Sequence, residues 1–216
     1  MPITVFIADD HAMVRDGLRM ILEAQGDIKV IGEAADGRAA VKLVRELNPD
    51  VTIMDISMPA LNGIDATKQI LKNNPSAKVI ILTMYSTTEH VYQAFRAKAV
   101  GYLLKESAGL EVVKAVRSVH TGERYLCQQI ADHVIDDYVH KREVAPESPL
   151  QRLSDREREI LQMVVEGKTS AEIAKILDLS PKTVETYRSR LMEKLEVHDL
   201  PSLVKFAIRH GLTGAE

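Results

Sequence analysis

Carboxylates, a hydroxyl and a lysine follow short apolar runs in the first half of the chain. These residues are Asp9, Asp10, Asp55, Thr83 and Lys105. Such runs have the length and composition of buried strands, and in a parallel sheet the carboxyl ends of the strands meet at one edge, where ligands bind. An acid at one strand end is often only a turn residue, but three carboxylates held together repel one another. They require a compensating lysine, a metal ion or a raised pKa, and their oxygen ligands suit Mg²⁺.

The elements that must position these residues follow from alternating apolar patterns. Stretches with apolar residues at helical spacing separate five strand-like runs, which cover residues 3–8, 28–34, 51–54, 78–83 and 100–104. The strands are continuous apolar runs, which indicates a sheet covered on both faces. The pattern therefore predicts an α/β fold with a doubly wound, five-stranded parallel sheet.

Length and composition limit the class of protein. A chain of 216 residues indicates two domains, since roughly 100–200 residues form one. The net charge of −3 carries no overall nucleic-acid signature. The single cysteine, Cys127, excludes an internal disulfide and a cysteine metal cluster, and favours a reducing compartment. No apolar run approaches the ~20 residues of a membrane span. The residues from Met1 onward begin a strand and do not resemble a charged leader peptide. We therefore expect a cytoplasmic protein without membrane contact.

The repeating pattern ends after His120. We therefore expect a first domain at residues 1–120 and a linker at 121–149, with one short helix at 130–138. Residues 141–149 are charged, contain two prolines and lack an apolar face, which favours a flexible to semi-rigid segment. The alternative is a surface loop within one domain.

Residues 150–216 carry the signatures of a small all-α domain. Two capping boxes and one Ser-Pro helix start precede apolar patterns of helical spacing: Ser154 with Glu157, Thr169 with Glu172, and Ser180-Pro181. The tight turn Asp178-Leu179-Ser180 joins the second predicted helix to the third, which begins at Pro181. Two short helices joined in this way predict a helix-turn-helix.

The helix that begins at Pro181 has one apolar and one polar side. Val184, Tyr187, Leu191 and Leu195 form the apolar stripe, and the opposite side carries small polar residues flanked by cations. This division suits a recognition helix in a DNA major groove, although an ordinary solvated helix would look similar. From residue 151 onward, 11 Lys and Arg balance 11 Asp and Glu, so DNA binding has to rest on the local excess of four cations over two acids at 181–195.

The first 120 residues resemble the receiver domain of response regulators, on the five residues at the strand ends. The resemblance implies a flavodoxin-like fold in which Asp55 accepts a phosphoryl group from a phosphohistidine. It also implies that Asp10, Asp55 and the backbone carbonyl of Ser57 ligate Mg²⁺, with Asp9 holding the ion through water. An aspartate nucleophile of this kind needs alignment and positive charge on the transferred oxygens, which Mg²⁺ and Lys105 supply.

The same resemblance implies a switch. Thr83 would donate to a phosphoryl oxygen, move toward it and leave space that Tyr102 fills; the alternative for Tyr102 is an ordinary core aromatic. Ser57 and Tyr85 stand where receivers commonly tune hydrolysis of the phosphoryl group. A residue as bulky as Tyr85 implies slow loss of phosphate.

The second domain is similar to the LuxR-type helix-turn-helix, on residues 153–157, 169–174 and 180–185. With the receiver in front, the whole chain resembles a NarL/FixJ-class response regulator. The resemblance implies base contacts by Glu185, Thr186 and Ser189, and gives as candidates for the DNA backbone Lys182, Thr183, Arg188, Arg190 and Lys194. Glu185 stands where many members carry Lys or Arg, and an acid there would accept from a cytosine amino group.

The last predicted helix is where this family dimerises on DNA. The candidate residues are Leu200, Leu203, Val204 and Ala207. The alternative is that this apolar side only closes the core of the domain.

We interpret the chain as a two-component transcription factor and not as an enzyme beyond assisting its own phosphorylation and dephosphorylation. Phosphorylation would shift a population from a closed form to one that dimerises on paired half-sites. The implied partners are a sensor histidine kinase, double-stranded DNA and a second copy, with RNA polymerase as a further candidate. One alternative is a phosphotransferase with an aspartyl nucleophile, but the common pattern has a second Asp where Ser57 stands. The other is a phosphorylation-controlled protein or RNA binder, which a test of salt and sequence dependence would separate.

Overall fold

The computed structural model describes residues 1–140, 149–210 and 212 of the chain. It divides into two compact units, Met1–Val144 and Ala145–Glu216, each with its own hydrophobic core. Residues 121–140, which we expected in the linker, therefore belong to the first unit, and expected linker residues 141–148 lie outside the described residues. Among the helices that are described, none is long and apolar enough to cross a membrane.

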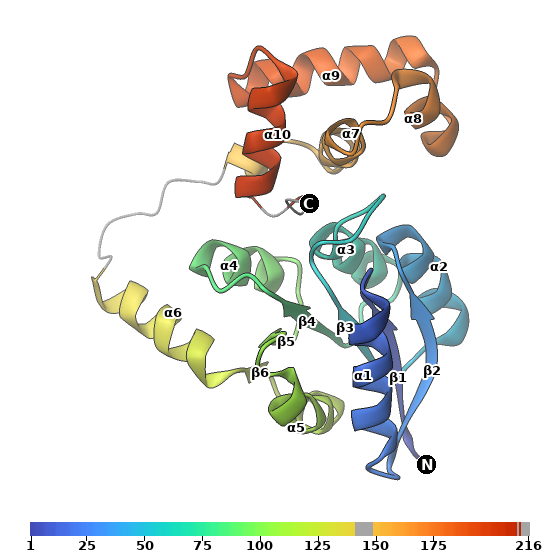
Figure 1. The fold of residues 1–216 in the computed structure, drawn as a ribbon, viewed down its shortest axis with the longest axis vertical. Helices are drawn as coiled ribbons and strands as arrows, with labels where there is room; N and C mark the ends of the chain where they lie inside the picture. The colour runs from blue at the N-terminus through green and yellow to red at the C-terminus, as the bar shows by residue number, and fades with distance from the viewer. Residues whose placement is uncertain (141–148, 211, 213–216) are drawn as a thin grey trace. The chain divides into compact units, whose positions relative to one another are not determined.

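The first unit is a parallel sheet with helices on both faces (Figure 1). Its strands are β1 Ile3–Ala8, β2 Ile28–Ala34, β3 Val51–Met54, β4 Val79–Thr83, β5 Gly101–Leu104 and β6 Tyr125–Leu126, in the order β2-β1-β3-β4-β5-β6. Its helices are α1 Ala12–Glu23, α2 Gly37–Leu47, α3 Gly63–Asn73, α4 Thr88–Arg96, α5 Ala108–His120 and α6 Gln128–His140. Helix α1 packs with α5, and α2 packs with α3. Every residue of β3, β4 and β5 is buried, as continuous apolar strands predict.

The prediction of five strands was one strand short. Tyr125 and Leu126 pair in parallel with Gly101 and Tyr102 of β5. Cys127, which follows directly, is fully buried in the core of the first unit. A strand of two residues is too short to produce a periodic pattern, so β6 could not be predicted from the sequence.

The loop between β3 and α3 depends on one glycine. The amide of Gly63 donates to the carbonyl of Ile56 at 2.8 Å, and a Cβ at position 63 would lie 1.8 Å from the carbonyl oxygen of Asp55. The side chain of Asn62 caps α3 by accepting from the amide of Asp65. The loop that carries Asp55 is thereby fixed against the start of α3.

Within its described residues, the second unit is all helical, as predicted. It comprises the 3₁₀ helix Pro149–Arg152 and helices α7 Asp155–Val165, α8 Ser170–Leu177, α9 Pro181–Leu195 and α10 Leu200–Arg209. Both predicted capping boxes are present, and the Ser180 side chain accepts from the amide of Thr183 at the start of α9. Helices α8 and α9 pack against each other in the expected helix-turn-helix order.

Candidate functional site

Backbone hydrogen bonds hold the predicted acids and lysine at the carboxyl edge of the sheet. The amide of Asp55 donates to Ala8 at 2.8 Å, and the amide of Lys105 donates to Thr83 at 2.9 Å. Each bond extends the pairing one residue beyond a strand end. The strands thus fix where these backbones lie, and the side chains converge on the same edge.

Lys105 bridges two buried carboxylates. Its Nζ lies 2.8 Å from Oδ2 of Asp9 and 2.9 Å from Oδ2 of Asp55. The side chains of the acids are 1% and 2% exposed, and that of Lys105 is 12% exposed. A lysine, one of the three compensations that the sequence left open, is therefore in direct contact with both carboxylates.

Burial and charge shift the pKa values of this group. Burial, together with the neighbouring Asp9 and Asp10 carboxylates, raises the pKa of Asp55 to about 6, although Lys105 opposes the shift. Burial alone would lower the pKa of Lys105, but the charges and hydrogen bonds of Asp55 and Asp9 outweigh it, and the pKa is raised. Burial and the neighbouring acids together outweigh the single ammonium at Asp55, so a further cation would stabilise its charged form.

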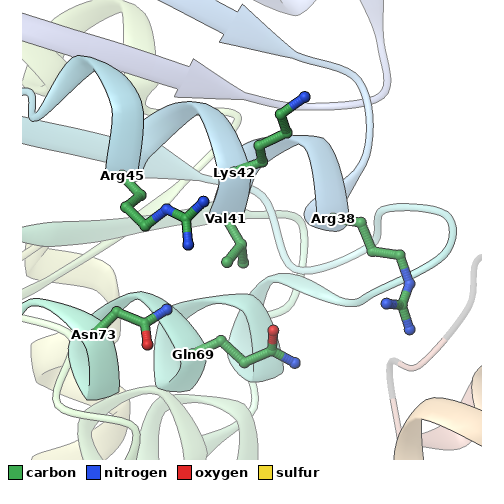
Figure 2. A pocket seen from close by; sticks show the side chains of 6 residues that line it. All are labelled: Arg38, Val41, Lys42, Arg45, Gln69 and Asn73. Atoms are coloured by element: carbon green, nitrogen blue, oxygen red, sulfur yellow. The ribbon is translucent and has the colours of Figure 1, made fainter. Parts of the chain in front are cut away.

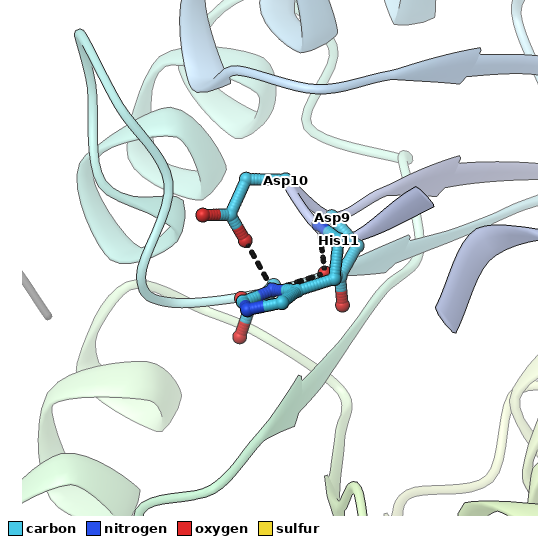
Figure 3. A group of neighbouring side chains, drawn as sticks. Asp9, Asp10 and His11 are labelled. Atoms are coloured by element: carbon cyan, nitrogen blue, oxygen red, sulfur yellow. Dashed lines mark hydrogen bonds and ion pairs between the residues drawn. The ribbon is translucent and has the colours of Figure 1, made fainter. Parts of the chain in front are cut away.

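His11 also belongs to the acid cluster, and this residue was not predicted from the sequence. Its Nδ1 lies 2.7 Å from Oδ1 of Asp10 and 3.2 Å from Oδ1 of Asp9 (Figure 3). Ligand atoms of Asp9, Asp10, His11 and Asp55 all lie within 4.8 Å of one another. The adjacency of His11 to the acid pair was the available signal. Three carboxylates with excess negative charge fit a hard divalent cation such as Mg²⁺.

Tyr85 connects the two residues predicted to form the switch. The hydroxyl of buried Tyr102 donates to the carbonyl oxygen of Tyr85 at 2.7 Å, and the amide of Tyr85 approaches the Thr83 hydroxyl oxygen at 3.3 Å. The hydroxyls of Tyr85 and Ser57 share a hydrogen bond of 3.1 Å. The sequence indicated each of these residues, but not that one backbone links Thr83 to Tyr102.

A cavity between α2 and α3 lies away from the acid cluster. It has a volume of about 250 Å³ and contains none of the predicted site residues (Figure 2). One apolar residue and five polar or cationic residues line it: Val41, and Arg38, Lys42, Arg45, Gln69 and Asn73.

In the second unit, the predicted DNA-contacting residues lie along α9. Lys182, Glu185, Thr186, Ser189 and Arg190 are exposed, while Thr183 and Arg188 are partly buried. Arg188 donates to the hydroxyl of Ser170 at 3.1 Å. Lys194 donates to Oε2 of Glu157 at 2.7 Å, so a phosphate contact by Lys194 would compete with this ion pair.

The predicted dimer residues on α10 divide into two groups. Leu203 and Ala207 are 1% and 0% exposed and belong to the core of the second unit, as the alternative prediction had it. Burial in one copy makes them unavailable for contact with another. Leu200 is exposed and Val204 partly exposed, so these two remain candidates for a dimer face.

Known proteins resemble both units. Residues 5–117 match the response regulator receiver domain, and residues 151–207 match the LuxR family of bacterial regulatory proteins. The chain is 42% identical over 214 residues to the response regulator UvrY of Escherichia coli K12, covering 99% of this chain and 97% of that protein. It is 42% identical over 210 residues to the transcriptional regulatory protein LiaR of Bacillus subtilis 168, covering 97% of this chain and 99% of that protein.

Solved structures agree with this assignment. A complex of the two-component response regulator RcsB with DNA is similar with a TM-score of 0.59 and 28% identity, covering 95% of this chain and 98% of that one. The two matched domains stand in the order that the acid cluster and the helix-turn-helix indicate. The chain therefore belongs to the NarL/FixJ class of two-component response regulators, with a receiver domain followed by a LuxR-type DNA-binding domain.

Proposed function

We propose that Asp55 accepts a phosphoryl group from the phosphohistidine of a sensor histidine kinase. An Asp55 oxygen forms the new bond to phosphorus as the bond between phosphorus and the histidine nitrogen breaks. The observation that carries this proposal is the buried Asp55 carboxylate, fixed at a strand end with the Lys105 ammonium 2.9 Å away. The ammonium is placed to stabilise charge on the transferred oxygens.

Mg²⁺ fits the donor set of the same site. Asp10, Asp55 and the backbone carbonyl of Ser57 would hold the ion, with Asp9 acting through water. When bound, the ion would neutralise the acids and the incoming phosphoryl oxygens. Lys105 holds Asp9 and Asp55 in place, and burial excludes bulk water from both carboxylates.

Phosphorylation of Asp55 would control the binding of the second unit to double-stranded DNA. Glu185, Thr186 and Ser189, which are exposed on α9, would enter the major groove, and the exposed Lys182 would contact the DNA backbone. The RcsB complex with DNA supports this role for the second unit. Because the unit carries balanced charge, two copies would bind together, and phosphorylation would favour the form that dimerises.

DNA binding by the full chain tests the proposal. Wild type and Asp55→Asn are compared with and without acetyl phosphate and Mg²⁺, at fixed salt, on a panel of duplexes. Phosphodonor should strengthen binding of wild type to some duplexes and leave Asp55→Asn unchanged. Phosphorylation of each protein by the donor is measured alongside DNA binding. If Asp55→Asn still takes up phosphate, the nucleophile lies elsewhere. If wild type takes up phosphate but shows no preference among the duplexes, the result favours a phosphorylation-controlled protein or RNA binder.

A further inference from the structure

The ring of Tyr85 lies between the loop after Asp55 and helix α4. Its hydroxyl bonds the hydroxyl of Ser57 at 3.1 Å, and its ring stacks on the imidazole of His90. The two ring centroids are 4.4 Å apart and the planes differ by 12°. The Tyr85 backbone is held separately, by Thr83 and Tyr102. The direction of the ring is therefore set by different contacts from those that set the backbone.

His90 is itself firmly placed. It is 4% exposed and lies in the first turn of α4. Its Nδ1 is hydrogen bonded to the hydroxyl of Thr87 at 2.6 Å. Thr87 is the N-cap residue of α4, yet its side chain makes no capping bond to the helix backbone. A hydroxyl at this position ordinarily caps the helix, and here it holds the imidazole instead.

We propose that His90 is a positioning residue that prolongs the lifetime of phosphorylated Asp55. This inference rests on the proposed function. In the hydrolysis that ends the signal, a water oxygen forms a bond to phosphorus, and the bond from phosphorus to Asp55 breaks, returning a carboxylate. One hydrogen stays on the new P–OH group, and the other proton passes to a phosphate oxygen or to solvent. His90 keeps the Tyr85 ring against Ser57, two residues from Asp55, and so restricts the approach of that water.

The test follows loss of phosphate from the full chain after labelling with acetyl phosphate and Mg²⁺ and removal of the donor. His90→Ala should shorten the half-life about two- to tenfold, the range expected for losing an aromatic pair, without changing the rate of uptake. His90→Phe keeps the stacked ring and should stay within about twofold of wild type. His120→Ala, an exposed histidine on α5, is the matched control.

A double-mutant cycle separates positioning from a general effect on the fold. In a Tyr85→Ala background, His90→Ala should produce no further change in half-life, because the ring it acts through is gone. An unchanged half-life in His90→Ala, or an effect that persists in the Tyr85→Ala background, would overturn the inference while leaving the proposed function standing. Failure of wild type to take up phosphate would overturn both.

Discussion

The Lys105 ammonium lies 2.9 Å from Oδ2 of Asp55, yet the pKa of Asp55 is raised from its usual 3.8 to about 6. Burial is the largest cause, and the Asp9 and Asp10 carboxylates add to it, so Lys105 offsets only part of the shift. In the metal-free protein, ionisation of Asp55 therefore lowers the stability of the folded state.

The first prediction concerns pH. Because the folded state binds the Asp55 proton more tightly than the unfolded state, stability should fall as the pH rises from 3.8 through 6, by about 3 kcal/mol in total. Asp55→Asn removes this titration. Without Mg²⁺ at pH 7.5 the variant should be more stable than wild type by about 2–3 kcal/mol, and the difference should narrow below pH 6. Denaturant unfolding across this range measures it, and a difference independent of pH would contradict the assignment.

The second prediction concerns Lys105. Lys105→Met leaves two buried carboxylates without their ammonium, so the metal-free first unit should lose about 3–5 kcal/mol. Added Mg²⁺ should restore part of this loss and raise the melting temperature of the variant. Lys29→Met, at an exposed position of β2, is the control and should change little. A variant as stable as wild type without metal would show that Lys105 does not offset the acids.

Gly63 gives the third prediction. A Cβ at this position would lie 1.8 Å from the Asp55 carbonyl oxygen, so Gly63→Ala must displace the loop that carries the acceptor. We expect a loss of more than about 2 kcal/mol together with slower phosphate uptake. Gly17→Ala, which meets open space on α1, should be neutral or stabilising by about 0.5–1 kcal/mol. Normal uptake by Gly63→Ala would show that the loop tolerates the displacement.

A fourth prediction separates the cations of α9. Lys194→Gln breaks the ion pair with buried Glu157 and should lower the stability of the second unit by about 1–2 kcal/mol. Lys182→Gln removes an exposed cation and should leave stability unchanged while reducing the salt slope of DNA binding by about 1. Equal effects of the two variants on both measurements would contradict this division.

The cluster of acids and lysine at the carboxyl edge of the sheet was predictable, because each of these residues stands at the end of an apolar run in the sequence. The starts of α7, α8 and α9 were equally predictable, since Ser154, Thr169 and Ser180 signal their caps locally. Contacts between distant parts of the chain have no such local signal in the sequence. The contact of Lys194 with Glu157 spans 37 residues, and the burial of Leu203 depends on helices that precede it. An apolar helix face looks the same whether it meets its own core or a second copy.

The short strand β6 has a consequence for how the receiver can be separated from the rest of the chain. It covers the outer side of β5, so a fragment ending at residue 120 would leave the backbone amides and carbonyls of β5 open to solvent. An uncovered strand edge is a template for pairing with another molecule, and such a fragment is prone to aggregate. A fragment ending at residue 140 keeps β6, Cys127 and α6 and avoids this exposure.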